Sequence, residues 1–333
     1  MQEIAQTLQT NEKRALSTSI NGSYKGKDIL SFDQFSADDL HALFSLTRRM
    51  KQLVVNHEAS HLLEGLIVSL LFFEPSSRTF SSFASAVKRL GAQTLELQNP
   101  EVVSSVNKGE TFEDTIRVFE AYSDAIVLRH PLAGAAQLAA EAADIVPVIN
   151  AGDGNNEHPT QTLLDLYTLY ETFGRLSGLT GLLVGDLLNS RTLHSLMRGL
   201  SLFEGNTVYL FAPQRLQLSR DELARYSARG ISIVEITSER EIPKTCDFWY
   251  WTRIQRERFG TPEEARNIPT FVATPALLDT YARKDTILMD PLPRVGTIDT
   301  ALDADPRSVY LRSQIRNGLY TRMALLALLM GRA

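Results

Sequence analysis

Two stretches of this sequence carry the same tripeptide, Ser-Arg-Thr, at residues 77–79 and 190–192. Each stretch follows an apolar run typical of a β-strand and precedes apolar residues at helical spacing. Hydroxyls, a guanidinium and the free N–H groups of a helix N-terminus together suit an anion such as phosphate. For either copy alone, the commoner explanation is a serine that caps the helix beside a surface arginine.

Other cationic, amide and carbonyl groups recur where predicted strands end, in both halves of the chain. Arg129 lies at the end of the run 125–130, and His158 and Gln161 follow a Gly/Asn-rich loop at the start of a helix. Arg191 belongs to the second tripeptide. Arg253 and Gln255 share one strand face where the run 247–253 ends, and a Pro-rich loop spans 290–294. Each has its own structural explanation, such as a core cap, a solvated strand face or a turn. Ligands of open α/β sheets bind at the carboxyl ends of strands. The recurrence therefore predicts one anion site in each half.

The motifs of several other chemistries are missing from the sequence. No G-x-G-x-x-G follows a first strand and no G-x-x-x-x-G-K-[ST] occurs, so nucleotide binding has no support. Zinc-ligand spacing and a serine nucleophile elbow are also absent. The remaining groups are arginines, one histidine, hydroxyls and amides, which predict a site that binds two anions and lets them react with each other.

The composition is that of a globular chain with two domains. Its 333 residues exceed the usual size of a single core, and 44% hydrophobic and 22% charged residues are ordinary values. A net charge of −5 argues against general nucleic-acid binding. The polar N-terminus does not read as a secretory signal, the longest apolar stretch contains Glu64 and is too short for a bilayer, and the lone Cys246 lies in an apolar run. We expect a cytoplasmic chain with a buried structural thiol and no nucleic-acid or membrane partner.

Strand-like and helical segments alternate after a polar N-terminal extension. Apolar strands are expected within 65–73, 125–130, 146–150, 179–186, 206–213, 231–236, 247–253 and 286–294. Short, nearly continuous apolar strands separated by helices indicate parallel sheets covered on both faces. The predicted fold class is therefore α/β, with two doubly wound domains, 1–158 and 159–311. A helix that starts at Pro159 joins them, and a C-terminal helix within 312–333 packs back on the first.

Seven ordered motifs resemble those of the aspartate carbamoyltransferase family, catalytic chain. They are SSRT, RHP, HPTQTLLDLYTLYE, VGDLLNSRTLHSL, TRIQRER, DPLPR and NGLYTRMALLALL, and the likeness runs from about residue 30 to the C-terminus. The resemblance implies a carbamoyl phosphate-binding first domain and an aspartate-binding second domain. It implies transfer of the carbamoyl group from carbamoyl phosphate to the α-amino group of L-aspartate, giving N-carbamoyl-L-aspartate and phosphate in pyrimidine (UMP) synthesis, without metal or cofactor.

The resemblance also assigns roles to the matching residues. Carbamoyl phosphate would contact Ser76, Ser77, Arg78, Thr79, Arg129, His158, Gln161 and the carbonyls of Leu292 and Pro293. L-Aspartate would contact Lys108, Arg191, Arg253 and Gln255, and in a homotrimer Ser104 and Lys108 would come from the neighbouring subunit. The catalytic set would be Arg78, Thr79, Lys108, Arg129, His158 and Gln161. Donors such as these suit a tetrahedral oxyanion, and the leaving phosphate can accept the amine proton.

Three positions depart from the family pattern. Ser77 replaces a threonine, which keeps a hydroxyl donor. Phe80 replaces an arginine, which indicates a different contact between elements. Asp290 replaces the histidine that begins the Pro-rich loop. This extra carboxylate would lower the affinity for aspartate unless it pairs with a neighbouring cation.

Two alternative functions remain open at this point. One is a carbamoyltransferase with another amine acceptor, such as ornithine, although Arg253, Gln255 and Arg294 suit an acidic acceptor. The other is a catalytically silent paralogue that acts as a binding subunit. The sequence also leaves open whether regulatory chains or a dihydroorotase bind.

Overall fold

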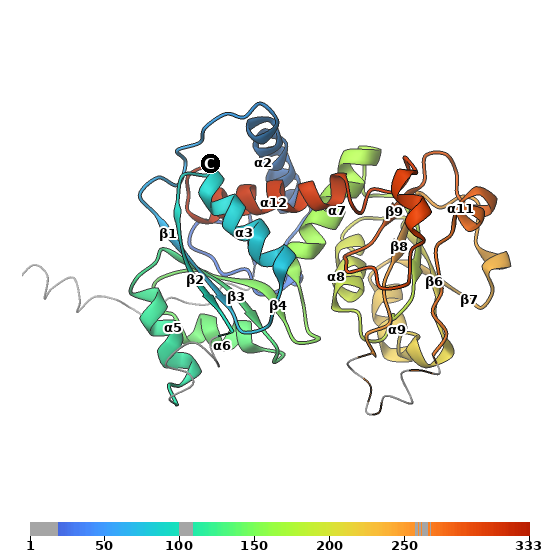
Figure 1. The fold of residues 1–333 in the computed structure, drawn as a ribbon, viewed down its shortest axis with the longest axis horizontal. Coiled ribbons are helices and arrows are strands. Elements are labelled where there is room, and N and C mark those ends of the chain that lie inside the picture. The colour runs from blue at the N-terminus through green and yellow to red at the C-terminus, as the bar shows by residue number, and fades with distance from the viewer. Residues whose placement is uncertain (1–18, 100–108, 257–258, 260, 262–265, 267) are drawn as a thin grey trace, which may run out of the picture. The chain divides into compact units, whose positions relative to one another are not determined.

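The computed structural model describes residues 19–99, 109–256, 259, 261, 266 and 268–333 (Figure 1). It divides into two compact units, Met1–Thr160 with Gly318–Ala333, and Gln161–Asn317. Both divisions fall inside helices, α7 (Pro159–Phe173) and α12 (Ser313–Leu329), so each of these helices contributes to both units. Sequence analysis placed its divisions after residues 158 and 311.

The first unit is a parallel sheet with helices packed around it. Besides the first residues of α7 and most of α12, its elements are η1 (Phe32–Gln34), α2 (Ala37–Val55), β1 (Ile67–Phe72), α3 (Ser77–Arg89), β2 (Gln93–Gln98), α5 (Phe112–Glu120), β3 (Ala125–His130), α6 (Ala135–Ala142) and β4 (Val148–Asp153). The strand order is β2-β1-β3-β4, and every pairing is parallel. Parallel strands place their carboxyl ends at one edge of the sheet, where ligands of such folds bind.

Helices lie on both faces of this first sheet (Figure 1). Helices α5 and α6 lie on one face (Figure 1), where Ile116 and Ala139 pack with Leu128 of β3. On the other face, α12 returns to α3: Arg322 donates to Ser82 Oγ at 2.8 Å and lies 5.1 Å from the ring of Phe83. The return of the C-terminal helix is thus confirmed.

The strand β2 was missed by sequence analysis. Its sequence, QTLELQ, alternates polar and apolar residues, and most of its side chains are exposed or half-buried. It forms the edge of the sheet and pairs only with β1 in the described residues. An edge strand with one solvent-exposed face lacks the continuous apolar run by which the buried strands were predicted.

The second unit is a larger parallel sheet. Its elements are the rest of α7, β5 (Thr180–Val184), α8 (Arg191–Leu200), β6 (Thr207–Phe211), η3 (Gln214–Leu216), α9 (Arg220–Ala228), β7 (Ser232–Ile236), η4 (Glu239–Glu241), β8 (Phe248–Trp251), α11 (Pro275–Tyr281), β9 (Ile287–Met289), η6 (Thr300–Ala304) and the start of α12. The strand order is β7-β6-β5-β8-β9, again with parallel pairings throughout. The predicted α/β class with two parallel sheets is therefore confirmed.

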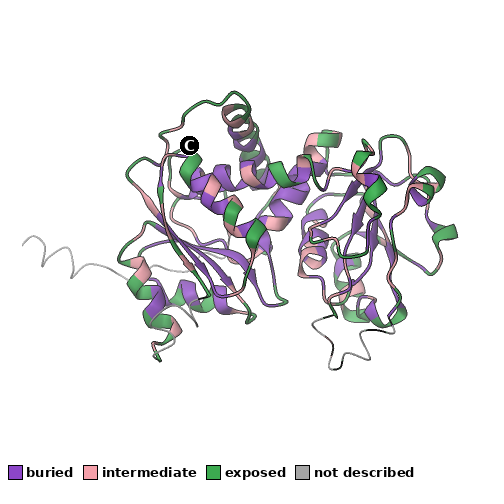
Figure 2. Ribbon diagram, in the orientation of Figure 1, coloured by how far each residue is buried: buried purple, intermediate pink, exposed green. Residues whose placement is uncertain are grey.

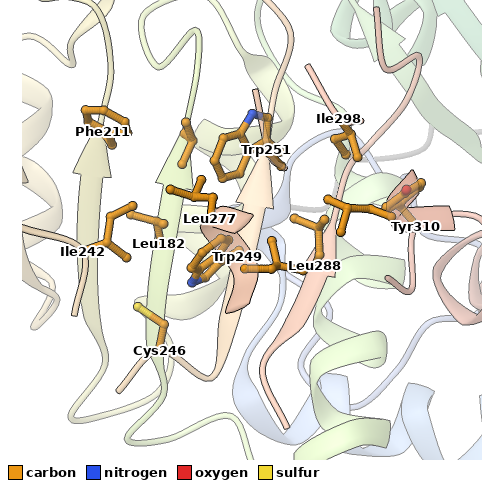
Figure 3. Packing of buried hydrophobic residues seen from close by; sticks show 14 of the residues in the cluster. Leu182, Phe211, Ile242, Cys246, Trp249, Trp251, Leu277, Leu288, Ile298 and Tyr310 are labelled. Carbon is orange, nitrogen blue, oxygen red and sulfur yellow. The ribbon is translucent and has the colours of Figure 1, made fainter. Parts of the chain in front are cut away.

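Figure 3 shows the core that holds this second sheet together. Trp249 and Trp251 of β8 point into the same apolar cluster as Leu277 of α11 and Leu288 of β9. Cys246 lies in this cluster, and burial raises the pKa of its thiol to about 12. The prediction of a buried structural cysteine is confirmed.

Several strands are buried along most of their length, whereas the strands β2 and β7 are largely exposed or half-buried (Figure 2). All six residues of β4 and all four of β8 are buried. Among the described helices, none combines the length and hydropathy that a membrane span requires.

Candidate active site

The two Ser-Arg-Thr segments begin helices whose N-cap serines make no capping hydrogen bond. Ser76 precedes α3 and Ser190 precedes α8, and neither side chain accepts from its own helix. By contrast, the N-cap side chains of α2, α5, α9 and α11 all accept a backbone N–H. Ser76 and Ser190 thus occupy N-cap positions without capping hydrogen bonds, and both helix N-termini keep backbone N–H donors for a ligand.

The first segment is held close to the histidine loop. Thr79 Oγ1 and His158 Nε2 are 3.4 Å apart, and both side chains are buried. The other ring nitrogen, Nδ1, lies 3.4 Å from Thr160 Oγ1. Ser77 and Arg78 are exposed at the surface of the same turn. The structure thus places the Thr79 hydroxyl, predicted to hold the phosphate, beside the His158 imidazole, predicted to bind the substrate carbonyl.

Arg129 stands at the same edge of the first sheet. Its position in β3 pairs with Phe72, the last residue of β1, so the arginine lies where β1 leads into the Ser-Arg-Thr segment. Its side chain is buried, with NH2 2.7 Å from Glu74 Oε2 and NH1 donating to the Ala151 carbonyl at 3.3 Å. A ligand anion at Arg129 must therefore share this cation with Glu74 or replace it.

A buried aspartate organises the loop that delivers His158, and sequence analysis missed it. Asp153 ends β4 and accepts from Asn150 Nδ2 at 2.9 Å and from the Gly134 amide at 2.8 Å. Gly154 follows with φ +52°, and a Cβ there would stand 2.6 Å from the Ala133 nitrogen. The Gly/Asn-rich composition signalled a loop, but the acceptor role of Asp153 depends on contacts with another connection.

The second Ser-Arg-Thr segment is tied to the segment after β8 that carries Arg253 and Gln255. The prediction that these two residues share a strand face is wrong, because β8 ends at Trp251. Asp186, after β5, is fully buried and accepts from the amides of Asn189 and Gln255, both at 3.0 Å. Gln255 Nε2 donates back to the Asn189 carbonyl at 2.8 Å. Sequence analysis did not single out Asp186, although it belongs to the quoted motif VGDLLNSRTLHSL.

The side chains of this second cluster are half-buried. Arg191 opens α8, and Arg253 NH1 donates to the Ile254 carbonyl at 3.3 Å. Ile254 itself is buried against Leu216. Within the second unit, the structure therefore links the two segments that carry the arginines and the amide predicted to bind the second anion.

The loop after β9 turns on a buried carboxylate. Asp290 Oδ1 accepts from the Leu292 amide, and the Asp290 amide donates to Gln314 Oε1 at 3.1 Å. The Leu292–Pro293 peptide bond is cis, and Leu292 has φ +58°. The carboxylate that departs from the family pattern thus serves as an internal acceptor of its own turn.

Two further residues differ from their predicted surroundings. Arg294 is bound by Asp303, which raises the pKa of the guanidinium, and donates to Tyr310 Oη at 3.1 Å. An argument for an acidic acceptor therefore rests on Arg191 and Arg253 rather than on Arg294. Phe80 packs edge-on against Phe72, with 5.2 Å between ring centroids, which is the different contact that its departure indicated.

The remaining predicted residues are placed as follows. Gln161 is half-buried in the first turn of α7 and donates from Nε2 to Asp165 Oδ1 at 3.1 Å. Ser104 and Lys108 lie outside the described residues. Within the described part of the chain, no group of three or more His, Cys, Asp or Glu side chains could hold a metal ion.

Comparison with known proteins matches both units in order. The aspartate/ornithine carbamoyltransferase family matches twice, with its carbamoyl-P binding domain over residues 27–171 and its Asp/Orn binding domain over residues 177–329. The chloroplastic aspartate carbamoyltransferase of Arabidopsis thaliana is 44% identical over 307 residues, covering 91% of this chain and 77% of that protein. The multifunctional protein pyr1-3 of Dictyostelium discoideum is 42% identical over 98% of this chain, which spans 15% of its length.

Solved structures agree. The catalytic subunit of M. jannaschii aspartate transcarbamoylase has a TM-score of 0.84 at 40% identity, covering 91% of this chain and 98% of that one. Aspartate transcarbamoylase from Trypanosoma cruzi in complex with carbamoyl phosphate and aspartate has a TM-score of 0.82 at 39% identity, covering 92% and 96%. With both domains matched and this identity over most of its length, the chain belongs to the aspartate carbamoyltransferase family.

Proposed function

We propose that this chain transfers the carbamoyl group of carbamoyl phosphate to L-aspartate, giving N-carbamoyl-L-aspartate and phosphate. The observation that carries the proposal is the pair of helix N-termini at Ser76 and Ser190, each without a side-chain cap and each followed by an arginine. One lies in the part matched to carbamoyl phosphate binding and the other in the part matched to binding of the amino acid.

Carbamoyl phosphate has its phosphate on the N-terminus of α3. Ser76, Ser77 and Arg78 offer hydroxyls and a guanidinium, and the helix end adds backbone N–H groups. Arg129 bridges the phosphate to the carbonyl, because its side chain lies at the same sheet edge. Glu74 forms an ion pair with Arg129, so the ligand must share the Arg129 guanidinium with Glu74.

The reaction passes through a tetrahedral intermediate with a negatively charged oxygen. Thr79, Arg129 and His158 are donors suited to this oxyanion, and the buried positions of all three strengthen their electrostatic effect. The C–N bond forms as the amine attacks, and the C–O bond to phosphate then breaks. The leaving phosphate takes the proton from the amine, so the mechanism requires no separate general base.

The carbamoyl nitrogen is oriented by hydrogen-bond acceptors. Gln161 Oε1 and the carbonyls of Leu292 and Pro293 are assigned to it. Leu292 lies in a turn that the Asp290 carboxylate holds through the Leu292 amide, which supports this role. Such acceptors distinguish a carbamoyl group, whose NH2 donates hydrogen bonds, from an acetyl group, whose methyl group has the same shape but donates none.

L-Aspartate binds to Arg191 through one carboxylate and to Arg253 and Gln255 through the other. Asp186 supports the proposal because it links these two segments through backbone amides. Two arginines suit a dicarboxylate, whereas an ornithine side chain would bring a third cation among them. Ornithine is therefore the disfavoured acceptor.

The assembly and setting also belong to the proposal. We expect a cytoplasmic homotrimer in which Ser104 and Lys108 of one subunit complete the site of the next. A place in pyrimidine synthesis is supported by the multifunctional relative pyr1-3. Regulatory chains or a dihydroorotase would be partners of this assembly.

Phosphate release in the presence of carbamoyl phosphate tests the function directly. We expect turnover with L-aspartate, none above background with ornithine, and no effect of a chelator. Turnover with ornithine would assign the chain to another acceptor, and no turnover with either would identify a silent paralogue. Loss of activity on chelation that a divalent ion restores would contradict the metal-free mechanism.

A further inference from the structure

A buried carboxylate in α7 joins three segments of the second unit. Asp165 is fully buried and lies one helical turn after Gln161. Its Oδ1 accepts from Gln161 Nε2 at 3.1 Å and from Gln314 Nε2 at 2.7 Å, and its Oδ2 accepts from the Tyr250 hydroxyl at 2.8 Å. The buried carboxylate thus accepts hydrogen bonds from these three neutral side chains.

The branch through Gln314 reaches the loop after β9. Gln314 donates to Asp165 with its nitrogen and accepts the Asp290 amide with its oxygen at 3.1 Å. Asp290 in turn accepts from the amide of Leu292. The carbonyls of Leu292 and Pro293 therefore follow a turn that is anchored, through two hydrogen bonds, to Asp165.

The branch through Tyr250 reaches the second Ser-Arg-Thr segment. Tyr250 is fully buried in β8, and its pKa lies well above the ordinary value because of burial and the charge of Asp165. The side chain of Thr192 acts in the opposite direction and lowers the pKa of the phenol, and the Thr192 hydroxyl is 3.1 Å from Ser190 Oγ. The carboxylate therefore contacts elements that carry residues assigned to both substrates.

We propose that Asp165 is a positioning residue that selects the carbamoyl amine of the substrate by fixing the amide of Gln161. An ionised carboxylate only accepts hydrogen bonds, so Gln161 must turn its NH2 toward Asp165. The atom that Gln161 offers to a ligand is then Oε1, an acceptor. The inference rests on the proposed function, which assigns Gln161, Leu292 and Pro293 to the carbamoyl nitrogen.

The same network holds all of the assigned acceptors in register. Gln161 contacts Asp165 directly, and the turn at Leu292 is reached through Gln314. A carbamoyl NH2 has two hydrogens to donate, whereas the methyl group of acetyl phosphate has none. Acetyl phosphate is otherwise close in shape and charge, so the ratio of the two dissociation constants measures the acceptors alone.

The test replaces Asp165 by asparagine and compares binding of carbamoyl phosphate and acetyl phosphate. Asparagine keeps the shape but can donate, which allows the Gln161 amide to turn and face the substrate with its NH2. We expect carbamoyl phosphate to bind about tenfold more weakly, the range for a buried polar group left unsatisfied, with acetyl phosphate changed less than about twofold. The KM for carbamoyl phosphate should rise in parallel.

Thr168→Val is the matched control. Thr168 is buried in the same helix, and its hydroxyl bonds only the Leu164 carbonyl and Asn317 Nδ2 in the described hydrogen bonds. It should lose stability without changing the ratio of dissociation constants. In a Gln161→Ala background, Asp165→Asn should change that ratio less than it does in the unaltered chain, because only the branch through Gln314 is left.

A second variant covers the case in which Asp165→Asn does not fold. Tyr250→Phe removes one donor from Asp165 Oδ2 and loosens the carboxylate that fixes Gln161, so the ratio should shift about threefold in the same direction. Equal weakening of both phosphates in whichever of these variants folds would show a merely structural role and overturn the inference. Failure of the proposed function looks different, because the unaltered chain would then neither bind carbamoyl phosphate nor form carbamoyl aspartate.

Discussion

Gly185 sets the distance between the two strand ends that carry the proposed aspartate site. It follows β5 with φ +115°, and a Cβ there would stand 2.0 Å from the carbonyl oxygen of Thr252. Thr252 is itself held by the Val184 carbonyl, through its amide at 2.8 Å and its hydroxyl at 3.0 Å. Gly185→Ala must therefore move the chain that leads to Arg253.

The size of the effect follows from these distances. A real Cβ needs at least 3.0 Å, so Thr252 must retreat by 3.0 − 2.0 = 1.0 Å or more. A misplacement of about 1 Å at a reacting group can lower the rate about 100-fold. The free energy of unfolding should also fall, by about 1–3 kcal/mol for the left-handed backbone and about 1–3 kcal/mol for the clash.

Gly230→Ala separates the cost of the left-handed backbone from the cost of the clash. Gly230 also lies in the second unit with φ +91°, but a Cβ there would meet no atom within 4 Å. It should lose the backbone term alone, about 1–3 kcal/mol, and keep its activity. Urea unfolding, the kcat/KM for aspartate and the binding of inorganic phosphate should be measured for both variants.

We expect Gly185→Ala to lower the kcat/KM for aspartate about 100-fold while inorganic phosphate, held by the first unit, binds as before. Equal kinetics in the two alanine variants would refute the reasoning, because the contact with Thr252 would then not position Arg253. Loss of phosphate binding in Gly185→Ala alone would show global damage instead.

Three other variants test separate parts of the chain. Arg253→Ala should weaken aspartate binding by up to about 2–5 kcal/mol, with solvent screening of the half-buried pair of Arg253 and the substrate carboxylate reducing the loss, and phosphate binding should not change. A near-normal affinity for aspartate in calorimetry would show that Arg253 does not belong to the site. Inactive His158→Ala and Lys108→Ala chains, denatured and reassembled together in equal amounts, should recover about a quarter of native activity in a closed trimer, whereas a same-chain role for Lys108 leaves the mixture inactive. Burial raises the Cys246 pKa to about 12, so its contribution to stability, present below pH 8, should fade between about pH 8.5 and 12 by up to about 1.4 kcal/mol per pH unit. Cys246→Ala should show a flatter loss of unfolding free energy over that range, and parallel curves would contradict the assignment.

The sequence alone determined the class of the fold and most of the chemistry. Buried parallel strands are continuous apolar runs, and such runs are visible without coordinates. The hydroxyl and guanidinium groups after β1 and β5 were also visible, because their types and their place between strand and helix are local properties. The amphipathic edge strand β2 escaped for the opposite reason, since its partner β1 defines it more than its own residues do.

Only the tertiary structure showed which polar residues hold the site together. Asp153, Asp165 and Asp186 are acceptors for groups distant in sequence, so nothing local distinguishes them from surface aspartates. For Asp290, by contrast, the sequence suggested a role that the structure does not show. Its type suggested an adverse charge at an anion site, whereas the structure turns the carboxylate onto the Leu292 amide.

The difference between what the sequence predicted and what only the structure showed has one physical cause. Propensity, periodicity and helix-end chemistry act over a few residues, so the sequence reveals strands, helices and the reactive groups at their ends. The orientation of a buried amide such as Gln161, and the close approach that requires a glycine at 185, depend on which distant atoms lie opposite, and only the folded chain decides that.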